Sequence, residues 1–207
     1  MAYPMAYPMA YTMGYPTFCT YPKKDTKLKD MSLFFYIFSW MAVFYGPVQF
    51  GRIVTQTRVF AIMDQWFTLP FFAWVICWNE FIYKNLTLSP IRILRIVYIS
   101  CTSYFVVLLH DQGFEIVLGL HILAVVAYSL RTQLSTLGSE DSRRYFLYAL
   151  VCCCGFVGLK LADHHLAGFT VFQRFTGHFW SKVCDIAQIH FVARFFQHLS
   201  LGKLKKQ

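Results

Sequence analysis

The chain has 207 residues, of which 57% are hydrophobic and only 14% are charged, and its mean hydropathy is +0.46. Soluble domains carry about 25% charged residues, so this composition excludes an ordinary soluble domain and indicates a membrane protein. The net charge of +9 does not indicate a nucleic-acid partner, because the basic residues lie in loops and tails while the aromatic residues fill apolar runs.

Residues 1–30 form a low-complexity N-terminal segment in which the tetrapeptide Met-Ala-Tyr-Pro is repeated with drift. Four prolines within residues 1–22 disfavour a regular helix, because proline lacks the amide hydrogen that a helix needs. We therefore expect irregular structure here. The alternative is the remnant of a seventh membrane-spanning helix, since no charged residue precedes Lys23.

Six apolar runs follow, each near the length of about 20 residues that a bilayer requires. They cover roughly residues 31–50, 59–78, 93–110, 114–130, 145–162 and 178–197. The segments between them are short, so neighbouring helices should be antiparallel. We predict an all-α membrane protein, with a serpentine bundle of six transmembrane helices over residues 31–197 and a basic tail over residues 198–207.

The basic residues of the connecting segments indicate the orientation. With six spans, one side of the membrane carries most of them, and the other side carries only Arg52, Arg58 and Arg174. Loops rich in Lys and Arg stay in the cytosol, so we expect both ends of the bundle there. The tail, with Lys203 and Lys205, resembles a dilysine retrieval signal, which favours the endoplasmic reticulum or Golgi over the plasma membrane.

Eight polar or charged residues are predicted at a similar depth, toward the lumenal side of the bundle. They are Gln49, Arg52, Asp64, Lys160, Asp163, His178, Lys182 and Asp185. A charge in hydrocarbon costs about 2.5–3.5 kcal/mol on insertion scales, so such a set has either a functional or a structural role. It forms either a buried site open to the lumen or an ion-pair network. We favour the network, because its positive and negative charges balance.

The spacing of the histidines does not favour a metal site. A helical zinc site presents two histidines four positions apart, but the residue four positions after His178 is Lys182. His164 and His165 are adjacent and would point about 100° apart on a helix. His121 is isolated on its run, and we expect it to be a hydrogen-bonded core residue. We expect no metal and no other cofactor.

From Tyr45 to Phe196 the chain resembles the transmembrane protein 187 family of multi-pass membrane proteins. The matching motifs include Tyr45-Gly46-Pro47-Val48-Gln49, Asp64-Gln65-Trp66 and the segment from Thr176 to Asp185. That family is distantly similar to the alkaline ceramidases and adiponectin-type receptors, in which seven helices hold a zinc ion on three histidines. A Ser and an Asp lie beside that zinc ion. Asp64 matches the Asp, and His178 matches the first of two histidines in the last helix. Lys182 replaces the second of them, and the Ser and the remaining His, expected around Tyr45–Arg52, are absent. The resemblance therefore implies a bundle without the metal, in which Lys182 neutralises Asp64.

Three hypotheses about function follow. The one we favour is a non-enzymatic protein of the endomembrane system, whose partners are the lipid bilayer and a lipid ligand; the sequence does not identify a protein partner. The second is a zinc-dependent lipid amidase with Asp64, His178 and Asp185 as ligands. The third is a proton-coupled carrier with Asp64, Lys182 and Asp185 as its relay.

Overall fold

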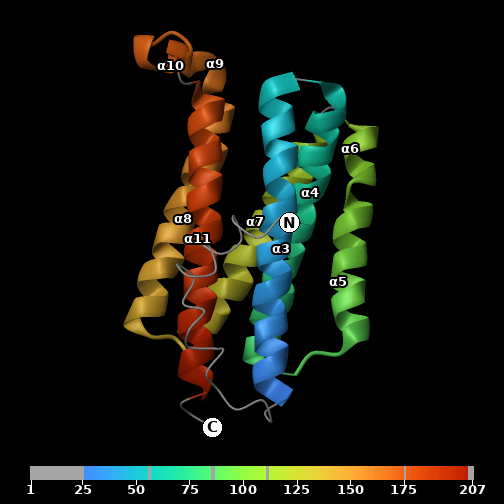
Figure 1. Cartoon of the computed structure of the whole chain (residues 1–207), viewed down its shortest axis with the longest axis vertical. Helices are drawn as coiled ribbons and strands as arrows, with labels where there is room; N and C mark the ends of the chain where they lie inside the picture. Colours follow the sequence, from blue (N-terminus) through green and yellow to red (C-terminus); the bar gives the residue numbers. More distant parts are fainter. Residues whose placement is uncertain (1–25, 56, 85–86, 111, 175, 205–207) are drawn as a thin grey trace, which may run out of the picture. The chain divides into compact units, whose positions relative to one another are not determined.

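The computed structural model describes residues 26–55, 57–84, 87–110, 112–174 and 176–204, and every regular element in these ranges is a helix (Figure 1). The helices are α3 (Thr26–Thr55), α4 (Arg58–Tyr83), α5 (Pro90–Ser103), α6 (Phe105–Leu109), α7 (Gly113–Leu134), α8 (Glu140–Leu161), α9 (Asp163–Leu166), α10 (Thr170–Arg174) and α11 (Gly177–Leu204). The N-terminal repeat and Lys205 of the dilysine pattern lie outside the described residues.

Five helical segments are long and apolar enough to cross a membrane, which confirms the prediction of an all-α membrane protein. They are Lys29–Thr55, Arg58–Tyr83, Pro90–Leu109, Gly113–Leu134 and Glu140–Leu161, and they correspond to the first five predicted runs. The sixth run lies within α11, whose 28 residues are long enough to span a bilayer at about 1.5 Å per residue. Lys182, Asp185 and Arg194 make α11 more polar than the other five, so its crossing stays a prediction.

The last helix continues into the segment predicted as a basic tail. Helix α11 extends to Leu204, and Leu199, Ser200 and Lys203 within it are buried. Lys203 of the dilysine pattern thus lies buried in the last helical turn, and the retrieval signal stays a prediction because Lys205 is outside the described residues.

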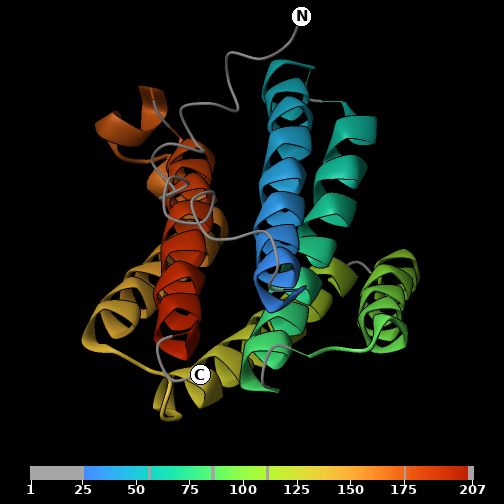
Figure 2. The ribbon, with the colours of Figure 1, turned by 60° about the horizontal axis from the view of Figure 1, so that its bottom comes forward.

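The chain divides into two compact units, Met1–Ser135 and Thr136–Gln207, which we call unit 1 and unit 2. In unit 1, α4 is the central helix and packs against α3, α5 and α7 (Figures 1 and 2). Trp78 of α4 is fully buried, stacks against Phe34 of α3 and packs at a tilt against Phe38 of the same helix. Lipid is as apolar as these rings, so close packing and interhelical hydrogen bonds, rather than the hydrophobic effect, stabilise the contact.

Helices α3 and α4 are antiparallel. Near one end, Phe34 of α3 stacks on Phe81 of α4 with ring centroids 4.6 Å apart. The backbone oxygen of Phe34 also accepts a hydrogen bond of 3.1 Å from the indole nitrogen of Trp74. Near the other end, Tyr45 of α3 contacts Asp64 of α4. The aromatic residues thus fix the register that brings the polar residues of the two helices together.

The third span is the least enclosed of the five, with only 6% of its most apolar stretch buried. It begins with Pro90 in the first helical turn, where a missing amide hydrogen has no cost. Helix α5 ends at Ser103, and α6 continues the span after Tyr104. Large apolar side chains along α5 and α6 are exposed, namely Ile91, Leu94, Tyr98, Ile99, Phe105, Leu108 and Leu109.

In unit 2, α8 and α11 lie side by side along their length, as both ribbon views show (Figures 1 and 2). Helix α8 begins with a capping box formed by Ser139 and Ser142, which satisfies amide groups at its N-terminus. A β-carbon on Gly155 of α8 would lie 2.8 Å from the sulfur of Cys184 of α11. The absence of a side chain at Gly155 therefore allows the close approach of the two helices.

Candidate functional site

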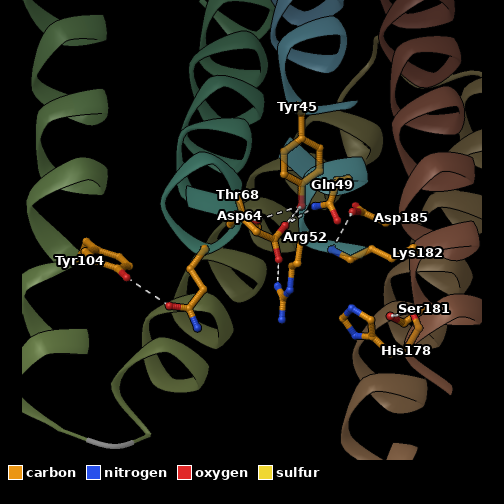
Figure 3. A network of polar contacts seen from close by, with 11 residues as sticks. Tyr45, Gln49, Arg52, Asp64, Thr68, Tyr104, His178, Ser181, Lys182 and Asp185 are labelled. Carbon is orange, nitrogen blue, oxygen red and sulfur yellow. Dashed lines mark hydrogen bonds and ion pairs between the residues drawn. The ribbon is translucent and has the colours of Figure 1, made fainter. Parts of the chain in front are cut away.

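Three side chains of α3 converge on the carboxylate of Asp64, which is 4% exposed (Figure 3). The hydroxyl of Tyr45 donates a hydrogen bond of 2.8 Å to Oδ1, and the side-chain amide of Gln49 donates to the same oxygen. The guanidinium of Arg52 forms an ion pair with Oδ2. Both carboxylate oxygens are thus engaged by donors from the neighbouring helix.

The spacing along α3 explains this convergence. Tyr45, Gln49 and Arg52 are separated by four and three positions, so they share one face of the helix. Helix α4 adds Thr68, whose hydroxyl lies 3.1 Å from that of Tyr45 and donates to the backbone oxygen of Asp64 at 2.7 Å. Three of the eight predicted residues, Gln49, Arg52 and Asp64, therefore meet in unit 1.

A second buried carboxylate, Glu80, lies near the other end of α4 and is missing from the predicted set. Its side chain is 6% exposed. Arg92 of α5 donates to Oε1 at 2.8 Å and also forms an ion pair with Oε2, while Lys84 lies 3.6 Å from Oε2. The sequence does contain a signal for this ion pair, because Lys84 follows Glu80 by four positions, the spacing at which opposite charges meet on a helix.

Polar contacts also join α7 to its neighbours. Fully buried Asn79 of α4 donates a hydrogen bond of 3.0 Å to the hydroxyl of Ser129. Nε2 of His121 lies 2.9 Å from the hydroxyl of Ser100 on α5, and its Nδ1 lies 2.8 Å from the backbone oxygen of Val117. Both ring nitrogens of His121 have hydrogen-bond partners, as predicted, but the side chain is half-buried and does not lie in the core.

The charged pair of α11 lies in unit 2. Nζ of Lys182 is 4.0 Å from Oδ2 of Asp185, three positions later on the same helix, and 5.8 Å from the ring centroid of Phe156 on α8. Lys182 is 8% exposed, and the adjacent Ser181 is fully buried and donates to the backbone oxygen of His178 at 2.8 Å. Unit 2 thus contains a counter-charge for Lys182, just as unit 1 contains one for Asp64.

The remaining members of the predicted set lie where α8 leads into α11. Lys160 is in the last turn of α8, and Asp163 begins α9. Oδ1 of Asp163 accepts a hydrogen bond of 3.0 Å from the backbone amide of His178. This amide is in the first turn of α11, where a carboxylate satisfies a free donor and interacts favourably with the helix dipole. Asp163 therefore acts as a cap of α11.

Groups of metal-binding side chains are absent from the described part of the chain. Among residues 26–55, 57–84, 87–110, 112–174 and 176–204, no three His, Cys, Asp or Glu side chains are close enough together to hold a metal ion.

Comparisons with known proteins give a consistent result. A sequence profile described as the TMEM187 protein family matches residues 5–197 of the chain. Transmembrane protein 187 of Homo sapiens is 46% identical to it over 164 residues, and Transmembrane protein 187 of Bos taurus is 46% identical over 163 residues. Each alignment covers 79% of this chain and 62% of the relative, so the chain spans less than two thirds of the relatives' length. No solved structure matches it.

Proposed function

This chain belongs to the transmembrane protein 187 family, and from that premise we propose that it is a non-enzymatic multi-pass membrane protein that binds a lipid. In this proposal the buried carboxylates have a structural role: they join helices that lipid alone would not hold together. The expected similarity to seven-helix lipid hydrolases would then concern the helical bundle and not its chemistry.

The contacts of Asp64 carry the proposal. A carboxylate that binds a metal, activates water or relays a proton needs an oxygen that is accessible to that ligand. The side chain of Asp64 is 5% exposed, and Tyr45, Gln49 and Arg52 donate to its two oxygens. These donors stabilise the charged form of Asp64 in a place where an unpaired charge is costly.

Lipid binding is supported by the apolar surface of the third span. Leu94, Ile99 and Leu108 are each at least 60% exposed, and they lie on a span that packs against its neighbours along little of its surface. Acyl chains are the chemical group that such a surface contacts in a bilayer.

The experiment that tests the role of Asp64 is metal and lipid analysis of the purified full chain. We expect much less than one zinc ion per chain, together with retained lipid, and we expect Asp64→Asn to leave the metal content unchanged. Asp141→Asn is the matched control, because Asp141 is exposed and carries the same charge. Near-stoichiometric zinc that is lost in Asp64→Asn but kept in Asp141→Asn would overturn the proposal in favour of a zinc-dependent amidase.

We also propose that the protein lies in the endomembrane system with its C-terminus in the cytosol. The Lys203 and Lys205 pattern supports the organelle. The orientation is supported by three cations at one end of unit 1, because Lys84 and Arg92 contact Glu80 and Arg131 lies over the ring of Tyr83. In sealed microsomes, an epitope at the C-terminus should be digested by added protease without detergent. Protection of that epitope until detergent is added would place the C-terminus in the lumen.

A further inference from the structure

A basic cluster lies where α4 ends and α5 begins, and it consists of Lys84, Arg92 and Arg95. Glu80 organises two of its members, because Nζ of Lys84 lies 3.6 Å from Oε2 and Nη2 of Arg92 lies 2.8 Å from Oε1. The side chains of Lys84 and Arg92 are 41% and 49% exposed. Their cationic groups are therefore held near one another and accessible from outside.

The basic cluster has more positive charge than Glu80 neutralises. One carboxylate balances one of the two cations that contact it. Arg95 follows Arg92 by three positions on α5, so the two lie on neighbouring parts of the same helix surface. Arg95 is exposed, and the described residues provide no hydrogen bond or ion pair for it. Arg131 of α7, 4.0 Å above the ring of Tyr83, adds a further cation at this end of unit 1.

An exposed apolar surface continues from the basic cluster along the third span. Ile91, Leu94 and Tyr98 of α5 are 70%, 69% and 66% exposed. A guanidinium group binds phosphate oxygens with two parallel hydrogen bonds, and exposed aliphatic side chains in a membrane contact acyl chains. The ligand that matches both surfaces is amphipathic, with an anionic phosphate at one end.

We propose that the basic cluster and the exposed face of α5 bind an anionic phospholipid of the adjacent leaflet. Its phosphate contacts Arg95 and Arg92, and its acyl chains lie along Leu94 and Tyr98. This inference rests on the lipid-binding part of the proposed function, and it names the class of lipid and the site. A juxtamembrane basic residue contributes enough attraction to an anionic lipid to raise affinity about fivefold.

The experiment is a lipid titration of the full chain in detergent, with bound lipid counted by native mass spectrometry. Phosphatidylserine and phosphatidylcholine with identical acyl chains are the two probes. We expect phosphatidylserine to bind about tenfold or more tightly than phosphatidylcholine, as two unneutralised cations predict. Arg95→Gln should lower the affinity for phosphatidylserine about fivefold, and that for phosphatidylcholine by less, because the choline cation already offsets the charge of its phosphate. Lys84→Gln, which keeps the Arg92–Glu80 contact, should also lower the affinity for phosphatidylserine.

Arg58→Gln is the matched control, because Arg58 is exposed at the start of α4 and its loss changes the net charge equally. It should leave both affinities unchanged. An equal loss in Arg58→Gln would overturn the site in favour of general charge attraction. Competition by glycerophosphoserine as effective as that by the lipid would overturn the role of the apolar face. Equal binding of both lipids would overturn the headgroup assignment and keep the proposed lipid binding, whereas no binding of either lipid would overturn both.

Discussion

Replacing Arg52 by Met should lower the free energy of unfolding by about 3–5 kcal/mol, the usual cost of removing one partner of a buried ion pair. The side chain of Arg52 is 21% exposed and that of Asp64 is 5% exposed, so solvent screens the remaining carboxylate poorly. Methionine retains much of the volume and the apolar stem of arginine. The loss of stability would therefore report the unpaired charge of Asp64. It can be measured by unfolding the purified chain in mixed micelles with increasing amounts of dodecyl sulfate.

The double variant Arg52→Met/Asp64→Asn separates charge from packing. It removes both charges, and the amide oxygen at position 64 still accepts hydrogen bonds from Tyr45 and Gln49. We expect it to recover most of the stability that the single variant loses, because the two effects are coupled. Arg58→Met, at an exposed position, should stay within about 0.5 kcal/mol of the parent. Full stability of Arg52→Met alone would contradict the pairing of Arg52 with Asp64.

Gly113→Ala should lower the free energy of unfolding by about 1–3 kcal/mol, because the added methyl group overpacks the contact between α6 and α7. A β-carbon at Gly113 would clash with the carbonyl oxygen of Val106 and lie 2.7 Å from Cα of Val107. These are backbone atoms, so they do not rotate away as a side chain does. The two helices would have to separate, and the same micelle titration would detect the change.

Gly119→Ala is the control on the same helix, since no heavy atom lies within 4 Å of a β-carbon there. It should raise the free energy of unfolding by about 0.5–1 kcal/mol, because alanine favours a helix over glycine. Equal stability of the Gly113 and Gly119 variants would show that α6 and α7 are not in backbone contact.

Much of the fold could be predicted from the sequence, because bilayer thickness imposes a length on each apolar run. The first five runs correspond to five helices with the composition of membrane spans. The boundaries were less predictable. Apolar composition alone ends the second run at residue 78. Helix α4 continues to Tyr83, because the backbone hydrogen bonds of a helix do not require apolar side chains. Glu80 was missed for this reason.

The candidate site was predictable in its composition and not in its pairing. The balance of charges indicated ion pairs, and Arg52–Asp64 and Lys182–Asp185 are such pairs. Which cation meets which anion depends on helix rotation and register, and hydropathy has no information about either. Asp163 shows the same limit, because its partner is a backbone amide that no side-chain pattern reveals. The predicted neutralisation of Asp64 by Lys182 is not needed, because Asp64 has a counter-charge in Arg52 and Lys182 has one in Asp185.

The two carboxylates of α4 have a consequence for biosynthesis. The cationic partner of Asp64 lies on α3 and is made before α4, whereas Arg92, the closer of the two cations that contact Glu80, lies on α5 and emerges from the ribosome after α4. When α4 reaches the insertion machinery, Arg52 can already neutralise Asp64, whereas Glu80 has only Lys84, which is 41% exposed and lies 3.6 Å from Oε2. Release into lipid at that stage would leave Glu80 without its closer partner. Helix α4 should therefore stay beside the translocon until α5 arrives, so that the three segments enter the bilayer as one assembled group.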